Sequence, residues 1–566
     1  MIQAKHYPWL LLLLSIGFFF PFLGNVHLFD WDEINFAESA REMIVTGDYY
    51  RVRINYEPFW EKPPFFFWLQ VLSMKLFGIN EFAARFPNAL FGVITVFTLY
   101  TIGKKHYNTR FGFIWGLLYL GSFLPHLYFK SGIIDPVFNL FIFLGIYFLA
   151  SCINSSNKNR IKAILSGCFI GLAIITKGPV GLLLLILTFV VYLIIKKFKV
   201  KINLVDVLLF TISSLLVTSI WFGYEVIQNG PWFIIEFIKY QIELFSEPVA
   251  GHEQPFYYHF IVVLLGCFPM SIFALGAFRK YKQDFPLDLM KWMKVLFWVV
   301  LILFSIVKTK IVHYSSMTYL PLSFIAAFFI YQVIENKQSF SKWIKAGFIF
   351  LGGVFTILLV LAPILFYNKN FLASFIKDEF AKDSLTINMG WTGWEFLVGL
   401  LYPLGIVLSI WLYKKQRRLA SITILSCFAG ITLFGYAIFV VPKIERFSQG
   451  PAIDFFESLQ GKNVYITTIG HKSYAHYFYA QMMPSKESDE ISTIKRNYKN
   501  SLSDPKDFNA NELKNKTNNW LLDGAIDKNA YFVTKSTHAL DLNKYKDIKM
   551  IERKGGFILY KRTQLK

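Results

Sequence analysis

The sequence predicts a polytopic α-helical membrane protein that ends in a small soluble α/β domain. The chain of 566 residues is 55% hydrophobic and has a mean hydropathy of +0.43. A water-soluble fold cannot bury this much apolar surface. Apolar runs of about 17 to 22 residues recur along the chain, and each is long enough to cross a bilayer core. After about residue 442 the composition becomes mixed polar and apolar, which marks the change to a soluble domain.

We expect thirteen crossings within a transmembrane domain that covers residues 1–441. Their ranges are 8–29, 83–103, 111–129, 133–152, 161–176, 179–195, 204–224, 256–278, 293–307, 315–334, 346–366, 393–413 and 419–441. The run at 65–79 is shorter and contains Lys75, so we interpret it as a re-entrant or interfacial helix. The first run has no small-residue cleavage site behind it, and we interpret it as a retained anchor.

The Lys and Arg residues predict the orientation of the chain. They lie in short clusters between the apolar runs, and a cytoplasmic N-terminus places every cluster on the cytoplasmic side. An odd number of spans then puts the C-terminal domain in the periplasm of a bacterial inner membrane. Topology therefore accounts for the net charge of +21, and we expect no nucleic-acid partner.

The soluble domain, residues 442–566, has the pattern of a mixed α/β fold. Short strands are predicted at 463–469, 530–535, 550–553 and 557–562, with helices near 451–460 and 473–482.

The connections predicted on the external side differ in kind from the cytoplasmic ones. They carry isolated charged residues beside Pro, Gly or aromatic residues instead of basic clusters. They are 30–64, 130–135, 177–179, 225–255, 308–314 and 367–392, and the longest are the loops 30–64 and 225–255. We therefore expect the chemically active residues to converge on one face of the membrane.

The stretch 30–64 has a high density of acids, bases and aromatic residues, and its first part has helical spacing. From Asp32 to about residue 46, apolar residues such as Phe36 and Met43 share one arc, with polar residues opposite. This is typical of a helix that lies along a membrane surface. Gly47 is a suitable end for such a helix.

Two carboxylates are the candidates for catalysis. Asp32 begins the predicted helix just outside the first span, and Asp135, in SGIIDP, stands at the outer edge of a later span. Either residue can simply cap a helix N-terminus, and Pro136 is typical of the first position of a helix. The spacing leaves both interpretations open. As a functional group, a carboxylate here would take a proton from an acceptor hydroxyl or orient a nucleophile.

Cations on the external side run against the charge bias and suit an anionic lipid. The residues concerned are Lys62, Lys177, Lys308, Lys310 and His313, and Arg41 in the predicted helix is a further candidate. A lysine at a water–lipid boundary can simply extend its amine into water. A point charge there would also stabilise the oxygen of a lipid-linked phosphate as it leaves.

Glu61 and His252 are the candidate ligands of a divalent metal. Imidazole and carboxylate together suit zinc, and manganese or magnesium are alternatives. Two ligands from distant loops form an incomplete set, and a single His in a polar loop is more often a surface residue. The aromatic residues near these loops, Tyr314 among them, are also typical of an interfacial belt.

At these residues the sequence resembles a known family. DWDEINFAESAREMIVTGDYY and YEPFWEKPP resemble the first periplasmic loop of the polyprenyl-phosphate-sugar glycosyltransferases. That group contains the 4-amino-4-deoxy-arabinose transferases acting on lipid A and the protein mannosyltransferase-like enzymes. SGIIDP, ITKGPVG, EPVAGHEQPFYYH and SIVKTKIVHYSSMTYLP resemble later signature segments in the same order.

The resemblance implies a GT-C type fold, with thirteen helices in the aminoarabinose branch. It implies that Asp32 is the catalytic or acceptor-positioning carboxylate, and that Asp135 is a second functional acid. It also implies that the donor phosphate is held by Lys62 and by the segment 308–314, which includes Lys308, Lys310 and Tyr314, and that Glu61 and His252 bind a metal. This chain has Asn35 where the aminoarabinose transferases commonly carry Arg.

The resulting hypothesis is an inverting glycosyltransferase of the cell envelope. It would transfer a sugar, such as aminoarabinose or a hexose, from a polyprenyl-phosphate donor to a lipid, glycan or protein acceptor on the outer face of the membrane. Lipid A modification and protein glycosylation are both included. The alternative is a polyprenyl-lipid transporter or flippase, which would place charges near the bilayer midplane on broken, repeated helices. The middles of the spans are nearly free of charge, which favours the enzyme.

Overall fold

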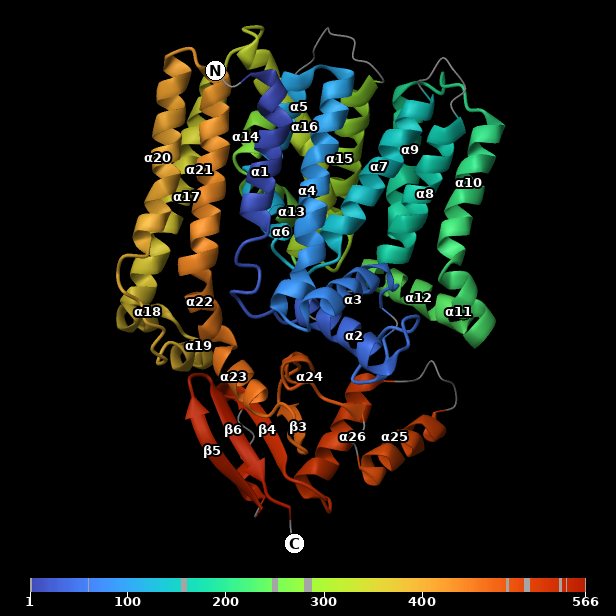
Figure 1. Ribbon diagram of the computed structural model, residues 1–566, viewed down its shortest axis with the longest axis vertical. Coiled ribbons are helices and arrows are strands. Elements are labelled where there is room, and N and C mark those ends of the chain that lie inside the picture. The colour runs from blue at the N-terminus through green and yellow to red at the C-terminus, as the bar shows by residue number, and fades with distance from the viewer. Residues whose placement is uncertain are drawn as a thin grey trace. The chain divides into compact units, whose positions relative to one another are not determined.

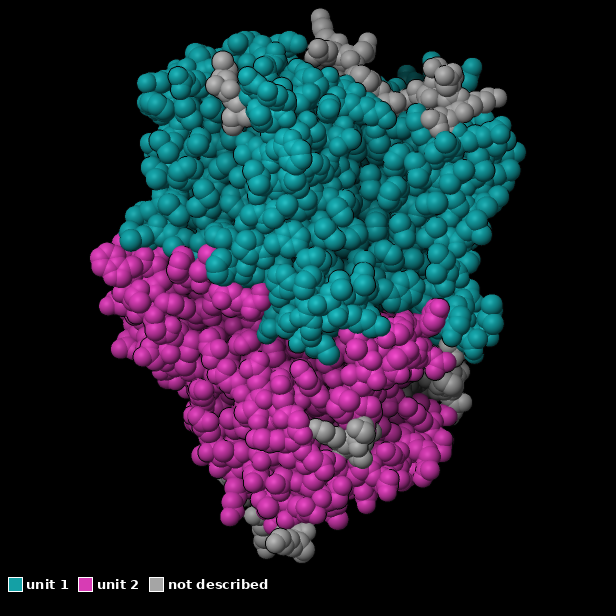
Figure 2. Space-filling model, viewed as in Figure 1, with its two compact units in different colours: residues 1–23, 60–359, 397–436 teal, residues 24–59, 360–396, 437–566 magenta. Residues whose placement is uncertain are grey.

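The computed structural model describes residues 3–59, 61–153, 160–246, 253–278, 288–484, 488–502, 509–538, 542–545 and 547–564. The chain forms two compact units (Figure 2). Unit 1 comprises Met1–Leu23, Trp60–Leu359 and Leu397–Tyr436, and unit 2 comprises Gly24–Phe59, Val360–Phe396 and Ala437–Lys566. The chain therefore passes from one unit to the other five times. The sequence did not indicate that the first loop would pack in one unit with the C-terminal residues.

Unit 1 is helical, and its long helices run side by side (Figure 1). They are α1 (Tyr7–Phe19), α3 (Phe65–Phe77), α4 (Glu81–His106), α5 (Thr109–Leu120), α6 (Phe123–Tyr128), α7 (Asp135–Ile153), α8 (Arg160–Lys177), α9 (Val180–Ile195), α10 (Leu204–Ser219), α11 (Phe222–Asn229), α12 (Trp232–Ser246), α13 (Tyr258–Gly266), α14 (Met270–Leu275), α15 (Leu289–Ile306), η4 (Val312–Thr318), α16 (Tyr319–Ile334), α17 (Lys342–Tyr367), α20 (Phe396–Lys414) and α21 (Arg418–Phe439). The last residues of α17 and α21 extend into unit 2.

The predicted polytopic α-helical fold is confirmed. Within the described residues, seven helices are long and apolar enough to cross a membrane, and the pair α10 and α11, bent by 52°, would make an eighth. The seven are α4, α7, α15, η4 with α16, α17, α20 and α21. Each of the thirteen predicted ranges contains one helix or two consecutive helices, several of them shorter than the predicted run. The run at 65–79 forms the short helix α3.

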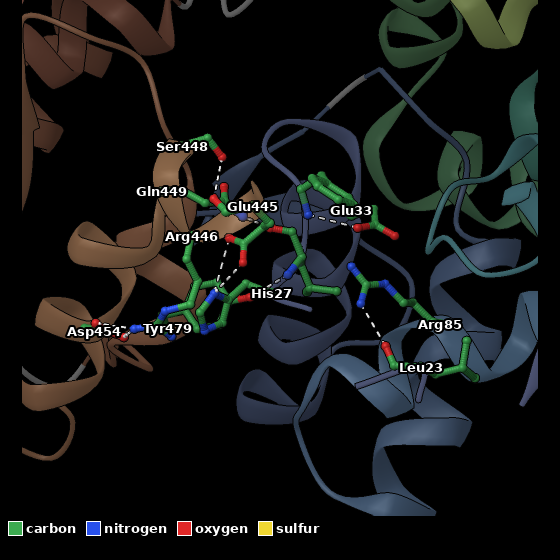
Figure 3. A network of polar contacts seen from close by, with 12 residues as sticks. Leu23, His27, Glu33, Arg85, Glu445, Arg446, Ser448, Gln449, Asp454 and Tyr479 are labelled. Carbon is green, nitrogen blue, oxygen red and sulfur yellow. Dashed lines mark hydrogen bonds and ion pairs between the residues drawn. The ribbon is translucent and has the colours of Figure 1, made fainter. Parts of the chain in front are cut away.

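Two basic side chains hold the C-terminal end of α1. The Lys130 ammonium donates to the carbonyl oxygens of Phe18 at 3.0 Å and Pro21 at 2.9 Å. The Arg85 guanidinium donates to the carbonyl oxygen of Leu23 at 2.8 Å (Figure 3). The last carbonyls of a helix lack partners within the helix and carry partial negative charge, so cations stabilise them. These contacts fix where the chain leaves α1.

Small residues allow α4 and α5 to approach closely. A Cβ atom on Gly103 would lie 2.7 Å from the Cα atom of Gly112 and 3.1 Å from the ring of Phe111. Membrane helices often pack through such residues, because lipid gives no hydrophobic drive for helix association.

We expect Gly103→Val to lower the free energy of unfolding by about 2 kcal/mol, as overpacked cores do. Gly17→Val in α1 is the matched control, because a Cβ atom there would have nothing within 4 Å. Thermal unfolding in detergent, followed by tryptophan fluorescence, measures both variants. Equal losses for the two would contradict the close packing of α4 against α5.

Unit 2 is a mixed α/β structure. Its elements are α2 (Asp32–Thr46), β1 (Arg53–Ile54), β2 (Glu57–Pro58), α18 (Lys369–Phe375), α19 (Glu379–Ser384), α22 (Val441–Ser448), α23 (Gly450–Ser458), β3 (Tyr465–Ile469), α24 (Ala475–Tyr479), α25 (Asp489–Ser501), α26 (Ala510–Asp523), β4 (Ala530–Lys535), β5 (Ile548–Lys554) and β6 (Phe557–Arg562). All four predicted strands and both predicted helices of the C-terminal domain are confirmed, and α25 and α26 are additional.

The four-stranded sheet has the order β3-β4-β6-β5. Strands β3 and β4 are parallel, with Tyr465 opposite Ala530, whereas β4–β6 and β6–β5 are antiparallel. Apolar side chains from the strands and from α26, such as Ile469, Phe532 and Leu521, form a buried core. Because β3 and β4 are parallel, both strands end at the same edge of the sheet.

Candidate active site

The residues singled out in the sequence are divided between the two units. Unit 1 contains Glu61, Lys62, Asp135, Lys177, Lys308, Lys310 and Tyr314, and unit 2 contains Asp32 and Arg41. His252 lies outside the described residues, so the predicted metal pair of Glu61 and His252 stays a prediction. Each unit has its own constellation of charged side chains.

The centre of the site in unit 1 is an ion pair between Asp135 and Lys177. Asp135 is the first residue of α7 and Lys177 is the last residue of α8. Because these helices are consecutive and pack against each other, the start of one lies near the end of the other. The Lys177 ammonium is 2.6 Å from Oδ1 of Asp135, and the side chains are only 16% and 7% exposed. The pair also places an acid at a helix start and a base at a helix end, as the helix dipole favours.

Further residues distant in sequence gather around this pair. The Lys177 ammonium lies 5.4 Å from the centre of the Tyr314 ring. The charges of His313 and Lys62 also act on the Asp135 carboxylate. The structure therefore brings together residues from 62, 135, 177 and the segment 313–314, and most of these residues are cationic.

Lys62 is the member of this group contributed by the first loop. Its ammonium lies 5.7 Å from the centre of the Tyr240 ring on α12 and 3.9 Å from Oε2 of Glu61. The Lys62 side chain is mostly buried, whereas that of Glu61 is 41% exposed. Glu61 is thus accessible to solvent, and its carboxylate contacts the Lys62 ammonium.

The remaining two lysines of the predicted phosphate site differ from each other. Lys310 is buried, and its charge acts on the buried imidazole of His259. Lys308 is exposed. The end of the loop 225–255 pairs with the segment 308–314 through an antiparallel bridge between Glu253 and Thr309. Contact of either lysine with a donor phosphate stays a prediction.

Asn88 holds the loop that leads to Asp135, and sequence analysis missed it. Its side-chain amide donates to the carbonyl oxygens of Ser131 at 2.6 Å and Ile133 at 2.7 Å. Asn88 is fully buried within α4. A single Asn in an apolar helix was the available signal, since a buried amide requires hydrogen-bond partners.

In unit 2, Asp32 is the first residue of α2, as predicted, and its side chain is partly buried. A helix on a membrane surface would turn its polar side toward water, and the polar side of α2 does not face water. The polar residues Asn35, Glu38, Arg41 and Glu42 are all buried. Helical periodicity shows that a helix has two faces, but it does not show what covers the polar one. Because Asp32 and Asp135 belong to different units, their meeting in one pocket stays a prediction.

Arg41 makes the central contacts on the buried polar side of α2. Its guanidinium binds both carboxylate oxygens of Glu38, at 2.7 and 2.6 Å, and donates to the carbonyl oxygen of Met482 at 2.8 Å. The Tyr56 hydroxyl donates to the same carbonyl at 2.6 Å. A bidentate pair of this kind is strong and directional. The hydrogen bonds to the Met482 carbonyl tie α2 to the C-terminal part of unit 2. A role of Arg41 at the donor phosphate stays a prediction.

Glu42 is a second buried acid next to this pair. Its Oε2 accepts a hydrogen bond from the backbone amide of Tyr56 at 2.8 Å. Burial and the neighbouring Glu38 hold the pKa of Glu42 well above its usual range. The carboxyl group therefore keeps its proton to a higher pH in the folded protein than in the unfolded chain.

This arrangement predicts how stability depends on pH. A raised carboxyl pKa contributes stability that is fully present below the unfolded value of about 4.3 and is lost as the pH rises toward the folded value. Glu42→Gln removes this loss and keeps an acceptor for Tyr56. We expect the variant to exceed the wild-type free energy of unfolding by about 1 kcal/mol or more at pH 7.5, with little difference at pH 4.5. Thermal unfolding at both pH values measures this, and a pH-independent difference would contradict it.

The segment before Asp32 is held by the C-terminal part of the chain, all within unit 2. The backbone amide of Leu28 donates to the Tyr479 hydroxyl at 2.7 Å, and the Gln449 side chain donates to the Leu28 carbonyl at 2.8 Å. His27 pairs with Glu445 at 3.2 Å (Figure 3). Residues that follow the last membrane helix therefore determine where α2 begins.

Several known proteins are similar to this chain in sequence. Residues 61–222 match the family described as dolichyl-phosphate-mannose-protein mannosyltransferase. The undecaprenyl phosphate-alpha-4-amino-4-deoxy-L-arabinose arabinosyl transferase of Shewanella sediminis is 27% identical over 355 residues, which are 61% of this chain and 63% of that protein. The corresponding transferase 1 of Proteus mirabilis is 27% identical over 484 residues, 82% of each chain.

The fold has a solved counterpart. The crystal structure of ArnT from Cupriavidus metallidurans bound to undecaprenyl phosphate superposes with a TM-score of 0.74 at 18% sequence identity. The match covers 99% of this chain and 98% of that one. The family model, the relatives and the fold all agree with the resemblance seen in the sequence. The chain therefore shares the fold of ArnT, and in sequence it is similar to the undecaprenyl phosphate-aminoarabinose arabinosyl transferases and, over residues 61–222, to the mannosyltransferase family.

Proposed function

We propose that the protein transfers a sugar from a polyprenyl-phosphate donor to an acceptor on the outer face of the membrane, with inversion at the anomeric carbon. The observation that carries the proposal is the cationic group around Asp135, formed by Lys62, Lys177 and His313 beside Tyr314. A membrane-embedded donor with a single phosphate needs such a group, because its leaving oxygen becomes negatively charged. The names of the relatives support the same donor class.

In this mechanism the acceptor hydroxyl attacks the anomeric carbon in line with the departing phosphate. Asp32 takes the hydroxyl proton, and the bond between the anomeric carbon and the phosphate oxygen breaks. Lys62 and Lys177 stabilise the polyprenyl phosphate that leaves. Asp135 holds Lys177 in place through their 2.6 Å contact. A divalent metal at Glu61 and His252 would add positive charge, and no step depends on it.

The sugar and the acceptor follow less directly from the residues. Aminoarabinose and lipid A are the first candidates, because the relatives are named as aminoarabinose transferases. Asn35 is neutral where those enzymes commonly carry Arg, and it is buried in α2. A glycan or protein acceptor, and a hexose as the sugar, are the other candidates.

The test has two stages. Mass spectrometry of envelope lipids and glycoproteins from a deletion strain identifies the modification that is lost. The purified protein in nanodiscs is then supplied with the matching undecaprenyl-phosphate sugar and acceptor, and transfer is measured. Lys62→Met is expected to lower transfer strongly, whereas Lys75→Met, an exposed lysine on α3, serves as the control. Movement of the donor lipid across the membrane of reconstituted vesicles, without transfer of the sugar, would favour a flippase and overturn the proposal.

A further inference from the structure

Two strands of unit 2 end at one edge of the sheet and deliver basic residues there. In the parallel pair β3–β4, Ile469 lies opposite Thr534. The loop that contains Lys472 and the last residue of β4, Lys535, therefore lie at the same edge of the sheet. Parallel sheets characteristically bind ligands at the carboxyl ends of their strands.

A third lysine reaches the same edge from α26. The Lys514 ammonium donates to the side-chain oxygen of Thr468 on β3 at 2.9 Å. The charge of Lys472 acts on Lys514, and the charges of Lys514 and Lys535 both act on the carboxylate of Asp30. The Lys472 ammonium also lies 4.6 Å from the centre of the Trp31 ring. We call Lys472, Lys514 and Lys535 the basic edge.

The basic edge has more positive than negative charge. None of the three lysines makes an ion pair of 4.0 Å or less with a carboxylate among the described residues. Asp30 is the acid that influences Lys514. Burial, together with Lys472, lowers the pKa of Lys514 to about 8, as expected where cations crowd together out of water. The buried imidazole of His476 lies in the same region, and the charge of Lys514 acts on it. Its Nδ1 atom has no hydrogen-bond partner in the part of the chain that the structure describes.

We propose that the basic edge binds a phosphate monoester group. A compact dianion suits three lysines that two strand ends and a helix bring to one edge of the sheet, and lysines bind phosphate as point charges. It would neutralise the excess charge that the Asp30 carboxylate only partly balances. Since Asp30 lies two residues before Asp32, the bound phosphate would sit beside the start of α2. The site lies within unit 2 and does not depend on the donor site of unit 1.

A phosphate monoester can come from a lipid headgroup or from free phosphate. The full-length protein is therefore placed in nanodiscs of phosphatidylcholine and titrated with inorganic phosphate by calorimetry. A second set of nanodiscs contains phosphatidate, and the apparent melting temperature is compared with that in phosphatidylcholine alone. Phosphate binding in the first assay assigns the site to the free ion, and stabilisation by phosphatidate assigns it to a lipid headgroup.

Four variants make the proposal specific. Lys514→Met is expected to weaken the binding by about tenfold or more, the effect of losing a charged hydrogen bond. Lys516→Met is the matched control, because this lysine of the same helix is half-exposed and pairs with Glu512. Asp30→Asn is expected to tighten phosphate binding severalfold, because it removes a competing carboxylate. Lys535→Gln repeats the first test if Lys514→Met does not fold.

Three outcomes would overturn the proposal. They are no response of the wild type to phosphate or phosphatidate, equal effects of Lys514→Met and Lys516→Met, and weaker binding by Asp30→Asn. All of these measurements are made without a sugar donor. A failure of the phosphate site is therefore distinguishable from a failure of the proposed sugar transfer.

Discussion

Asp32→Asn is expected to lower the rate of sugar transfer by about 10²–10⁴-fold, the usual contribution of a general base. Asparagine keeps the size of the side chain at the first position of α2, but it cannot accept the proton of the acceptor hydroxyl. Binding of the donor should change little, because the cations proposed to hold its phosphate lie in unit 1. Transfer in a single turnover and donor binding at equilibrium are measured separately.

The control for this variant is Asp48→Asn, in the loop that follows α2. Asp48 forms a partly exposed pair with Arg53 at 2.8 Å, and such pairs contribute little. We expect transfer within about twofold of the wild type, since surface pairs contribute at most about 1 kcal/mol. Equal transfer by Asp32→Asn and wild type would show that Asp32 is not the general base.

Lys177→Met is expected to have the second large effect, on both stability and activity. It leaves the buried carboxylate of Asp135 without its cation, and breaking a buried ion pair in this way costs about 3–5 kcal/mol. The double variant Asp135→Asn/Lys177→Met removes both charges, so its stability should recover in part. Its transfer activity should stay low, because the phosphate has still lost a cation.

Lys196→Met provides the comparison within unit 1. Lys196 pairs with Asp288, and both side chains are more exposed than those of Asp135 and Lys177. We expect a loss of about 1 kcal/mol or less. Unfolding in detergent and the transfer assay measure all three variants. An equal stability loss in the single and double variants would contradict the ion-pair explanation.

The fold could be predicted well because its signals are local. A long apolar run is sufficient to indicate a membrane helix, and each predicted run contains helix. The lengths of the helices could not be predicted as well as their presence. The predicted span 8–29 contains α1, which ends at Phe19, where Lys130 binds the Phe18 carbonyl and Arg85 binds the carbonyl of Leu23 in the turn that follows. Those two residues lie far from α1 in the sequence, so no local pattern could indicate the end.

The candidate site could be predicted in its residue types more than in its contacts. Isolated cations on external loops identified Lys62 and Lys177 as functional candidates. The direct pair between Lys177 and Asp135 depends on how α7 and α8 pack, which spacing does not encode. The contacts of Leu28 use its backbone amide and carbonyl, and every residue has these groups, so they left no signal in the sequence.

The interleaving of the two units affects the order in which the protein can be completed during synthesis. Residues Gly24–Phe59 leave the ribosome early, but Glu445, Gln449 and Tyr479, which bind the segment before Asp32, are made near the end. Domains generally fold as units during translation, and unit 2 lacks these parts until then. A nascent or truncated chain that stops before residue 445 therefore carries Asp32 without the contacts that position it. In such a chain the segment before Asp32 lacks the partners that hold it in the structure.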